Sequence, residues 1–290
     1  MAIAVLTTAS NTATVASSIT VAKPTGLAED DLMVAVICSY DGTGTISTET
    51  GWTSVAHVNN ARDVRIFWKI ATAGDVAASD FTFDTSEIVS NIAGAILRIT
   101  GYATTSGEEI MGAEADSDIA VNSATISLET TLAPNNNGTL FVMGFVAADA
   151  GGGVATVGSY ALSDGATTFT ELFDTSEDAG SVDPVLAAAY GIQTTATTLT
   201  TFGATISQSR EDHYGAIIAV QPLTNASVSL DALSLTGTVN TLTAIGGANV
   251  TLDQIALTAT PNDVSAVEAT PKWSNTDKSS PSSFTNTDKS

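Results

Sequence analysis

Apolar residues in the first three quarters of the chain recur with a period of two, and no long stretch shows the period of a helix. The clearest example lies between residues 64 and 70, where the apolar positions are Val64, Ile66, Trp68 and Ile70 and the intervening ones are Arg65, Phe67 and Lys69. Because successive side chains of a strand point to opposite faces, this alternation predicts a half-buried β-strand.

Two other segments, Leu32–Cys38 and Leu140–Ala148, are continuous apolar runs of strand length. Such runs are typical of central strands that are covered on both faces. Strand signals separated by Gly, Asn, Asp and Pro clusters continue through residues 1–222, while strong helix formers are scarce. The pattern therefore predicts an all-β body over 1–222, an antiparallel sandwich of jelly-roll type.

The body contains two segments that resemble each other. Residues 31–36 match residues 139–144 loosely, and Gly94–Leu97 matches Gly215–Ile218 more closely. One interpretation is a duplication, in which the halves 1–105 and 106–222 form the facing sheets of one sandwich or two separate domains. Short apolar runs also resemble one another by chance, so unrelated strands are the alternative.

A stronger repeat occupies residues 223–270. Residues 227–248 and 249–270 are two copies of a 22-residue unit that share the pattern Val-x-Leu-Asp followed by Leu-Thr-x-Thr. A shift in the apolar alternation at Asp231-Ala232 predicts a bulge or tight turn between two short strands. Two such units cannot enclose a core, so we expect them to dock on the body, on other subunits or on another protein. The expected docking residues are Val228, Leu230, Leu233, Leu235, Val250, Leu252, Ile255 and Leu257.

The last segment, 271–290, repeats an aromatic residue followed by one residue and then Asn-Thr-Asp-Lys-Ser. The aromatics are Trp273 and Phe284. Buried aromatics dominate the energetics of many interfaces, so this pattern favours a docking peptide. The alternative is an idle polar tail.

The formal net charge is −22, from nine Lys and Arg against 31 Asp and Glu. A surface this acidic repels phosphate backbones, which argues against a nucleic-acid partner. No apolar stretch reaches the length of a membrane span, so we expect no membrane insertion. Met1–Val5 lacks the basic residues that open a secretory signal, which favours synthesis in a cytoplasm.

Few residues offer chemistry. His57 and His213 are the only histidines, and neither has the spacing of a zinc motif, so we interpret both as surface or strand-edge residues. Cys38, the single cysteine, lies in an apolar run and is expected to be buried. Trp52 is interpreted as a core residue rather than a sugar-binding platform. The sequence therefore predicts a protein that is not an enzyme.

One acidic stretch raises the question of calcium. Four carboxylates, Asp174, Glu177, Asp178 and Asp183, fall within a loop-like segment, and calcium prefers hard oxygen ligands on loops. The stretch does not follow the EF-hand pattern. A solvated acidic loop is the simpler interpretation, and a calcium site is the alternative; no other cofactor is expected.

Several short motifs of the body stand out: Pro24, Gly26 and Leu27 leading into residues 30–35, then Gly51–Thr53, Phe67–Ala71 and Ala93–Ile96. In these motifs the chain resembles a domain of tailed-bacteriophage virion structural proteins, and the Trp273–Ser279 type of tail repeat is similar as well. The resemblance implies a β-sandwich particle component at the virion surface that contacts other virion proteins and forms a homo-oligomer, with a trimer favoured.

Three functions compete on this reading: a capsid decoration or fibre subunit, an adhesin that binds a host surface glycan, and a hydrolase. The first is favoured.

Overall fold

The computed structural model describes nine stretches of the chain: residues 2–40, 44–58, 62–103, 110–148, 153–165, 167–176, 184–223, 228–229 and 250–251. The chain divides into two compact units, Met1–Asn225 and Ala226–Ser290. In the second unit the described elements are the two-residue strands β12 (Val228–Ser229) and β13 (Val250–Thr251).

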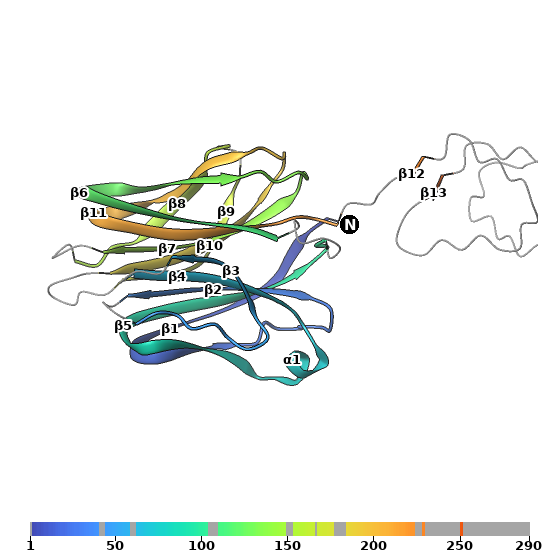
Figure 1. Ribbon diagram of the computed structural model, residues 1–290, viewed down its shortest axis with the longest axis horizontal. Helices are drawn as coiled ribbons and strands as arrows, with labels where there is room; N and C mark the ends of the chain where they lie inside the picture. The colour runs from blue at the N-terminus through green and yellow to red at the C-terminus, as the bar shows by residue number, and fades with distance from the viewer. Residues whose placement is uncertain are drawn as a thin grey trace, which may run out of the picture. The chain divides into compact units, whose positions relative to one another are not determined.

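The first unit consists of two antiparallel sheets that pack face to face (Figure 1). One sheet has the order β1 (Ala4–Ala22), β5 (Asp80–Thr100), β2 (Leu32–Tyr40), β4 (Arg62–Ile70), β3 (Thr53–Val58). The other has the order β6 (Ile110–Leu132), β11 (Leu199–Val220), β7 (Thr139–Ala148), β10 (Val185–Gln193), β9 (Phe169–Ser176), and β8 (Val157–Leu162) also pairs with β11.

The predicted all-β sandwich is confirmed. Its jelly-roll character is not confirmed, because β1 to β5 all lie in one sheet and β6 to β11 in the other.

The central strands β2 and β7 are buried on both faces, as their continuous apolar runs predict. Val36 and Cys38 of β2 meet Val142 and Val146 of β7 in the core between the sheets. The alternate residues of each strand point the other way, into a second core on the outer side of their own sheet. Phe67, an intervening residue of the alternating strand β4, is also fully buried there.

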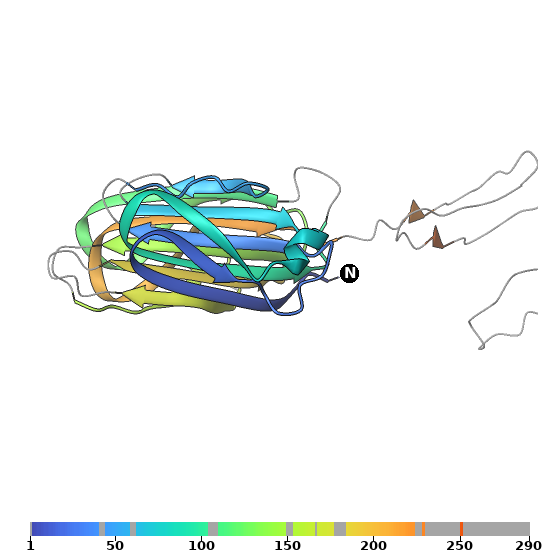
Figure 2. The ribbon, with the colours of Figure 1, turned by 90° about the horizontal axis from the view of Figure 1, so that it is seen from below.

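The outer cores exist because the longest strands fold over their own sheets. In β1, the Asn11 side-chain amide donates to Thr20 O at 2.8 Å and the Thr7 hydroxyl donates to Thr25 O at 2.8 Å, so the two ends of the strand lie side by side. The fold occurs near Val15, which has a positive φ of 49°. Figure 2 shows the doubled-over strand at the edge of its sheet.

The two halves of the unit repeat one arrangement. With β8 left aside, the sheet order in each half places the first and last strands together, followed by the second, fourth and third. Leu32 pairs with Ile99 in the first sheet, and the residues that match them in sequence, Leu140 and Val220, pair in the second. Positions matched in sequence therefore occupy matched places in the two sheets.

Smaller details repeat as well. A one-residue bulge lies at Val55 in β3 and at Leu172 in β9, opposite equivalent positions of β4 and β10. In the first half, Thr45 N donates to the Ser86 hydroxyl at 2.9 Å and Ser86 N donates to Thr45 O at 2.8 Å. Thr156 and Ser207 exchange the same two bonds, at 2.9 and 2.8 Å, in the second half.

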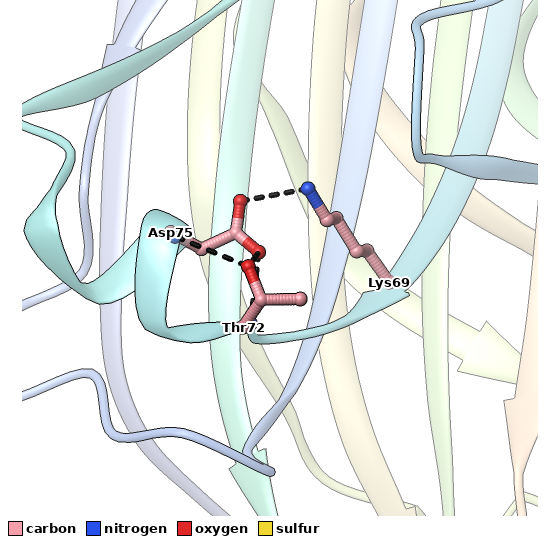
Figure 3. A network of polar contacts seen from close by, with 3 residues as sticks. All are labelled: Lys69, Thr72 and Asp75. Atoms are coloured by element: carbon pink, nitrogen blue, oxygen red, sulfur yellow. Dashed lines mark hydrogen bonds and ion pairs between the residues drawn. The ribbon is translucent and has the colours of Figure 1, made fainter.

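One short helix, α1 (Ala73–Ala77), connects β4 to β5. Thr72 caps its first turn, and Asp75 at the third helical position completes a capping box with the Thr72 backbone. The Asp75 carboxylate also forms an ion pair with Lys69 Nζ, at 2.7 Å. Figure 3 shows the three side chains together.

Candidate functional site

Of the ten predicted docking residues, two lie in described strands. Val228 of β12 pairs with Val250 of β13, and Ser229 pairs with Thr251, in parallel. Val228 and Val250 are the equivalent second positions of the two 22-residue repeats. The backbones of the two copies are therefore aligned in register at this point. The others lie outside the described residues: Leu230, Leu233, Leu235, Leu252, Ile255, Leu257, Trp273 and Phe284.

Of the four carboxylates considered for calcium, the structure describes Asp174, and Glu177, Asp178 and Asp183 lie outside the described residues. Asp174 Oδ2 accepts the Val157 N–H at 2.8 Å. Burial raises the pKa of Asp174, and the negative charge of Glu171 raises it further. The hydrogen bond from Val157 N–H lowers this pKa in part. Within the described ranges no three His, Cys, Asp or Glu side chains converge as a metal site.

The two histidines differ from each other. His57 lies in β3, where it pairs with Arg65 of β4. His213 lies in β11 and is fully buried, so its interpretation as a surface or strand-edge residue is wrong. The polar run Arg210–Tyr214 suggested exposure, but residues from distant parts of the chain cover this position.

The two residues expected in the core are there. Trp52 is 8% exposed and packs edge-on against Phe81, with 5.7 Å between ring centroids. Cys38 is fully buried, and burial raises the pKa of its thiol far above the ordinary value. Neither residue is available to solvent for sugar binding or nucleophilic attack.

Every lysine and arginine of residues 1–223 is engaged within the structure. Lys23 donates to Val76 O, Lys69 pairs with Asp75, and Arg98 pairs with Asp31 at 2.6 Å. Arg65 donates to Ile46 O at 2.6 Å, and Arg210 donates to Gly153 O. The exposed charges of the described body are consequently acidic. The composition alone does not show this, because it does not say which charged side chains form internal contacts.

The sixth cation, Arg62, joins the two sheets. It extends from β4 to form an ion pair with Asp212 of β11. Its guanidinium also lies over two tyrosine rings, 5.8 Å from the centroid of Tyr40 and 5.5 Å from that of Tyr214. Arg62 is therefore a structural link between the halves.

Several surface depressions of the body are lined by described residues. One, of about 510 Å³, is lined by the apolar or aromatic residues Ile70, Tyr102 and Leu223 and by acidic residues that include Glu29 and Asp30. The Tyr102 hydroxyl donates to Asp30 O at 2.6 Å. Burial raises the pKa of that hydroxyl, and the nearby Asp30 and Asp31 raise it further.

A second depression, of about 190 Å³, lies on the outer side of the other half. Its floor is Gly203, where a side chain would collide with Ile126 O. Five of its lining residues carry hydroxyl groups: Thr125, Ser127, Ser159, Thr201 and Thr205. These groups form hydrogen bonds but supply no acid, base or metal ligand.

Comparisons with protein-family models, with curated proteins and with solved structures found no match. None of the helices in the described part of the chain is long and apolar enough to cross a membrane.

Proposed function

We propose that this chain is a non-enzymatic structural protein of a tailed-phage particle. It serves as a capsid decoration or fibre subunit, exposed at the virion surface, and it docks to other virion proteins through its C-terminal repeats. It is made in the host cytoplasm and assembles as a homo-oligomer, with a trimer favoured.

The observation that carries this proposal is the parallel pairing of β12 with β13. It joins equivalent positions of the two repeats, as stacked units of a repeat array do. Two stacked units leave the outer edges of the stack unpaired, and a partner strand can pair with them. The N-terminal body, in contrast, already encloses its own cores.

The body supports a scaffold function. Its cations are committed to internal contacts, its cysteine is buried, and its described polar groups mainly hold strands and loops together. Catalysis needs acidic, basic or nucleophilic groups that converge in a water-excluding pocket.

Deletion after Asn225 tests the docking function, because Leu223 still donates to Gly101 O and the body keeps its own contacts. We expect the truncated body to fold, shown by unchanged circular dichroism and thermal unfolding. It should be lost from purified particles, as measured by mass spectrometry with copy number. Incorporation at wild-type occupancy would refute docking through the repeats.

A second candidate is an adhesin that binds a host surface glycan. The depression around Gly203 favours it, because five Ser and Thr residues line it and its volume of about 190 Å³ suits one sugar ring. The walls lack an exposed aromatic platform, which makes this function the weaker of the two. Replacement of Thr205 by Val should abolish glycan-array binding if the depression is the site, and Thr14→Val on the other half serves as the matched control.

A further inference from the structure

The depression of about 510 Å³ that Ile70, Tyr102 and Leu223 line combines apolar surface with acidic groups. Leu223 is 38% exposed and Ile70 is only partly buried, so apolar surface remains open to solvent here. Glu29 and Asp30, both exposed, line the same depression. Apolar surface beside carboxylates suits a side chain with an apolar stem and a cationic end, and lysine is such a side chain.

Hydrogen bonds between three segments hold this depression in shape. The Tyr102 hydroxyl donates to Asp30 O at 2.6 Å, and Leu223 N donates to Gly101 O at 2.7 Å. The turn that carries Asp30 is held as well, because Asp30 N donates to Ala71 O at 3.0 Å. A site that already has its binding shape loses little conformational entropy when a ligand binds.

The acidic groups of the depression are available to a ligand. The ion pairs among the described residues use other acids, one of them the pair of Asp31 with Arg98, and they leave out Glu29 and Asp30. Burial raises the pKa of the Tyr102 hydroxyl, and the negative charges of Asp30 and Asp31 raise it further. The charges therefore act on the interior of the depression, where a cation would be stabilised.

The chain has few cations that could bind there. Six of its nine Lys and Arg lie within residues 1–223, where each is engaged in contacts of the body. The other three, Lys272, Lys278 and Lys289, lie in the segment 271–290. Lys278 and Lys289 each follow an aromatic residue, Trp273 or Phe284, by five positions. The segment thus carries the cations that the body leaves over, in a repeated setting with an apolar neighbour.

We propose that this depression receives a lysine of the segment 271–290 from a second copy of the chain. The lysine stem lies against Ile70 and Leu223, and the ammonium pairs with Glu29 and Asp30. The inference rests on the proposed docking function and names its partner, the body of another copy. Because each copy has one depression and one such segment, the contact joins copies head to tail, and a ring forms where the rotation closes.

Zero-length cross-linking of the full chain tests the contact, because a carbodiimide joins an amine to a carboxylate only where the two groups meet. Unlabelled and ¹⁵N-labelled chains are mixed in high salt, which screens ion pairs, and are returned together to low salt. Mass spectrometry then identifies the cross-linked peptides. We expect lysines of 271–290 joined to Glu29 or Asp30, in pairs that combine the two isotopes.

Charge reversal gives a second measurement on the full chain. Glu29→Lys should weaken self-association, measured by sedimentation, by at least about tenfold, because a like charge then faces the lysine. Glu129→Lys is the matched control, an exposed acid elsewhere on the body, and should leave self-association unchanged. Reversal of Lys272, Lys278 and Lys289 to Glu in the Glu29→Lys chain should restore it. Loss of folding cannot explain a restored association.

Three outcomes would overturn the proposal. The lysines of 271–290 could cross-link without preference to acids across the body. The cross-links to Glu29 and Asp30 could be confined to single-isotope pairs, as docking within one chain gives. Glu29→Lys could self-associate as the wild type does. The proposed function fails separately: if these cross-links are absent but deletion after Asn225 still removes the chain from particles, the repeats dock on another protein and only this receiving surface is wrong.

Discussion

Gly144 of β7 faces the other sheet across the inner core, and adding one methyl group there tests the sandwich packing. A Cβ at this position would lie 2.6 Å from Val36 Cγ2, 3.0 Å from Val64 Cγ1 and 3.1 Å from Cys38 Sγ. All three neighbours come from the facing sheet and are fully buried. Gly144→Ala must therefore push the sheets apart or distort a side chain.

The magnitude follows from two opposing terms. Overpacking in a core costs about 1–3 kcal/mol. Replacing Gly by Ala restricts the unfolded chain and returns about 0.4–1 kcal/mol. We expect Gly144→Ala to lower the free energy of unfolding by about 1–2 kcal/mol, measured by urea denaturation at a constant m-value.

Val36→Ala should rescue part of this loss, because it removes the atom that the new methyl group meets. Alone, Val36→Ala costs about 2 kcal/mol for the lost methyl groups and the cavity. The double variant should be more stable than the sum of the single effects by about 1 kcal/mol or more. Gly158→Ala is the control, since a Cβ there meets open space. Strict additivity, or Gly144→Ala as stable as Gly158→Ala, would refute the packing argument.

Three further predictions follow from the contacts. Burial raises the pKa of the Cys38 thiol, so a thiol reagent should leave it unmodified in the native protein at pH 8 and label it fully in denaturant. Burial alone would raise the pKa of Asp75, but hydrogen bonds from Lys69 and Thr72 outweigh it and lower that pKa. Its contribution to stability is therefore present above pH 4 and lost as the pH falls through the lowered value, and unfolding curves of Asp75→Asn should lack this dependence. Arg62→Met should lower the free energy of unfolding by about 1–3 kcal/mol in urea, whereas an Arg62 that contributes only a surface ion pair would give less than about 1 kcal/mol.

The strand content and the core could be predicted from sequence, because the information is local. Every residue of Leu32–Cys38 is apolar. An edge strand would need apolar side chains on one face only, so this pattern indicates a central strand. Trp52, after a glycine turn, likewise belongs to the core by its size and neighbours. In these cases the residue type itself determines where the side chain is stable.

The site details could not be predicted, because distant segments create them. His213 sits in a polar run, and its neighbour Arg210 binds Gly153, about sixty positions earlier. The pairing of Arg62 with Asp212 joins residues in different halves. No local pattern encodes either contact. Gly144 did carry a signal: a glycine inside an apolar strand often marks a close approach of another backbone or side chain.

The doubled-over strand β1 has a consequence for how the molecule behaves at high concentration. A long, uncharged edge strand is a template on which a neighbouring molecule can add its own strand. Amyloid-like fibres can grow from such templates. The carbonyls of Thr20 in β1 and of Thr25 just after it accept hydrogen bonds from side chains of β1, and the bend at Val15 interrupts the straight edge with which an incoming strand would pair. Both features work against strand addition at this edge of the sheet.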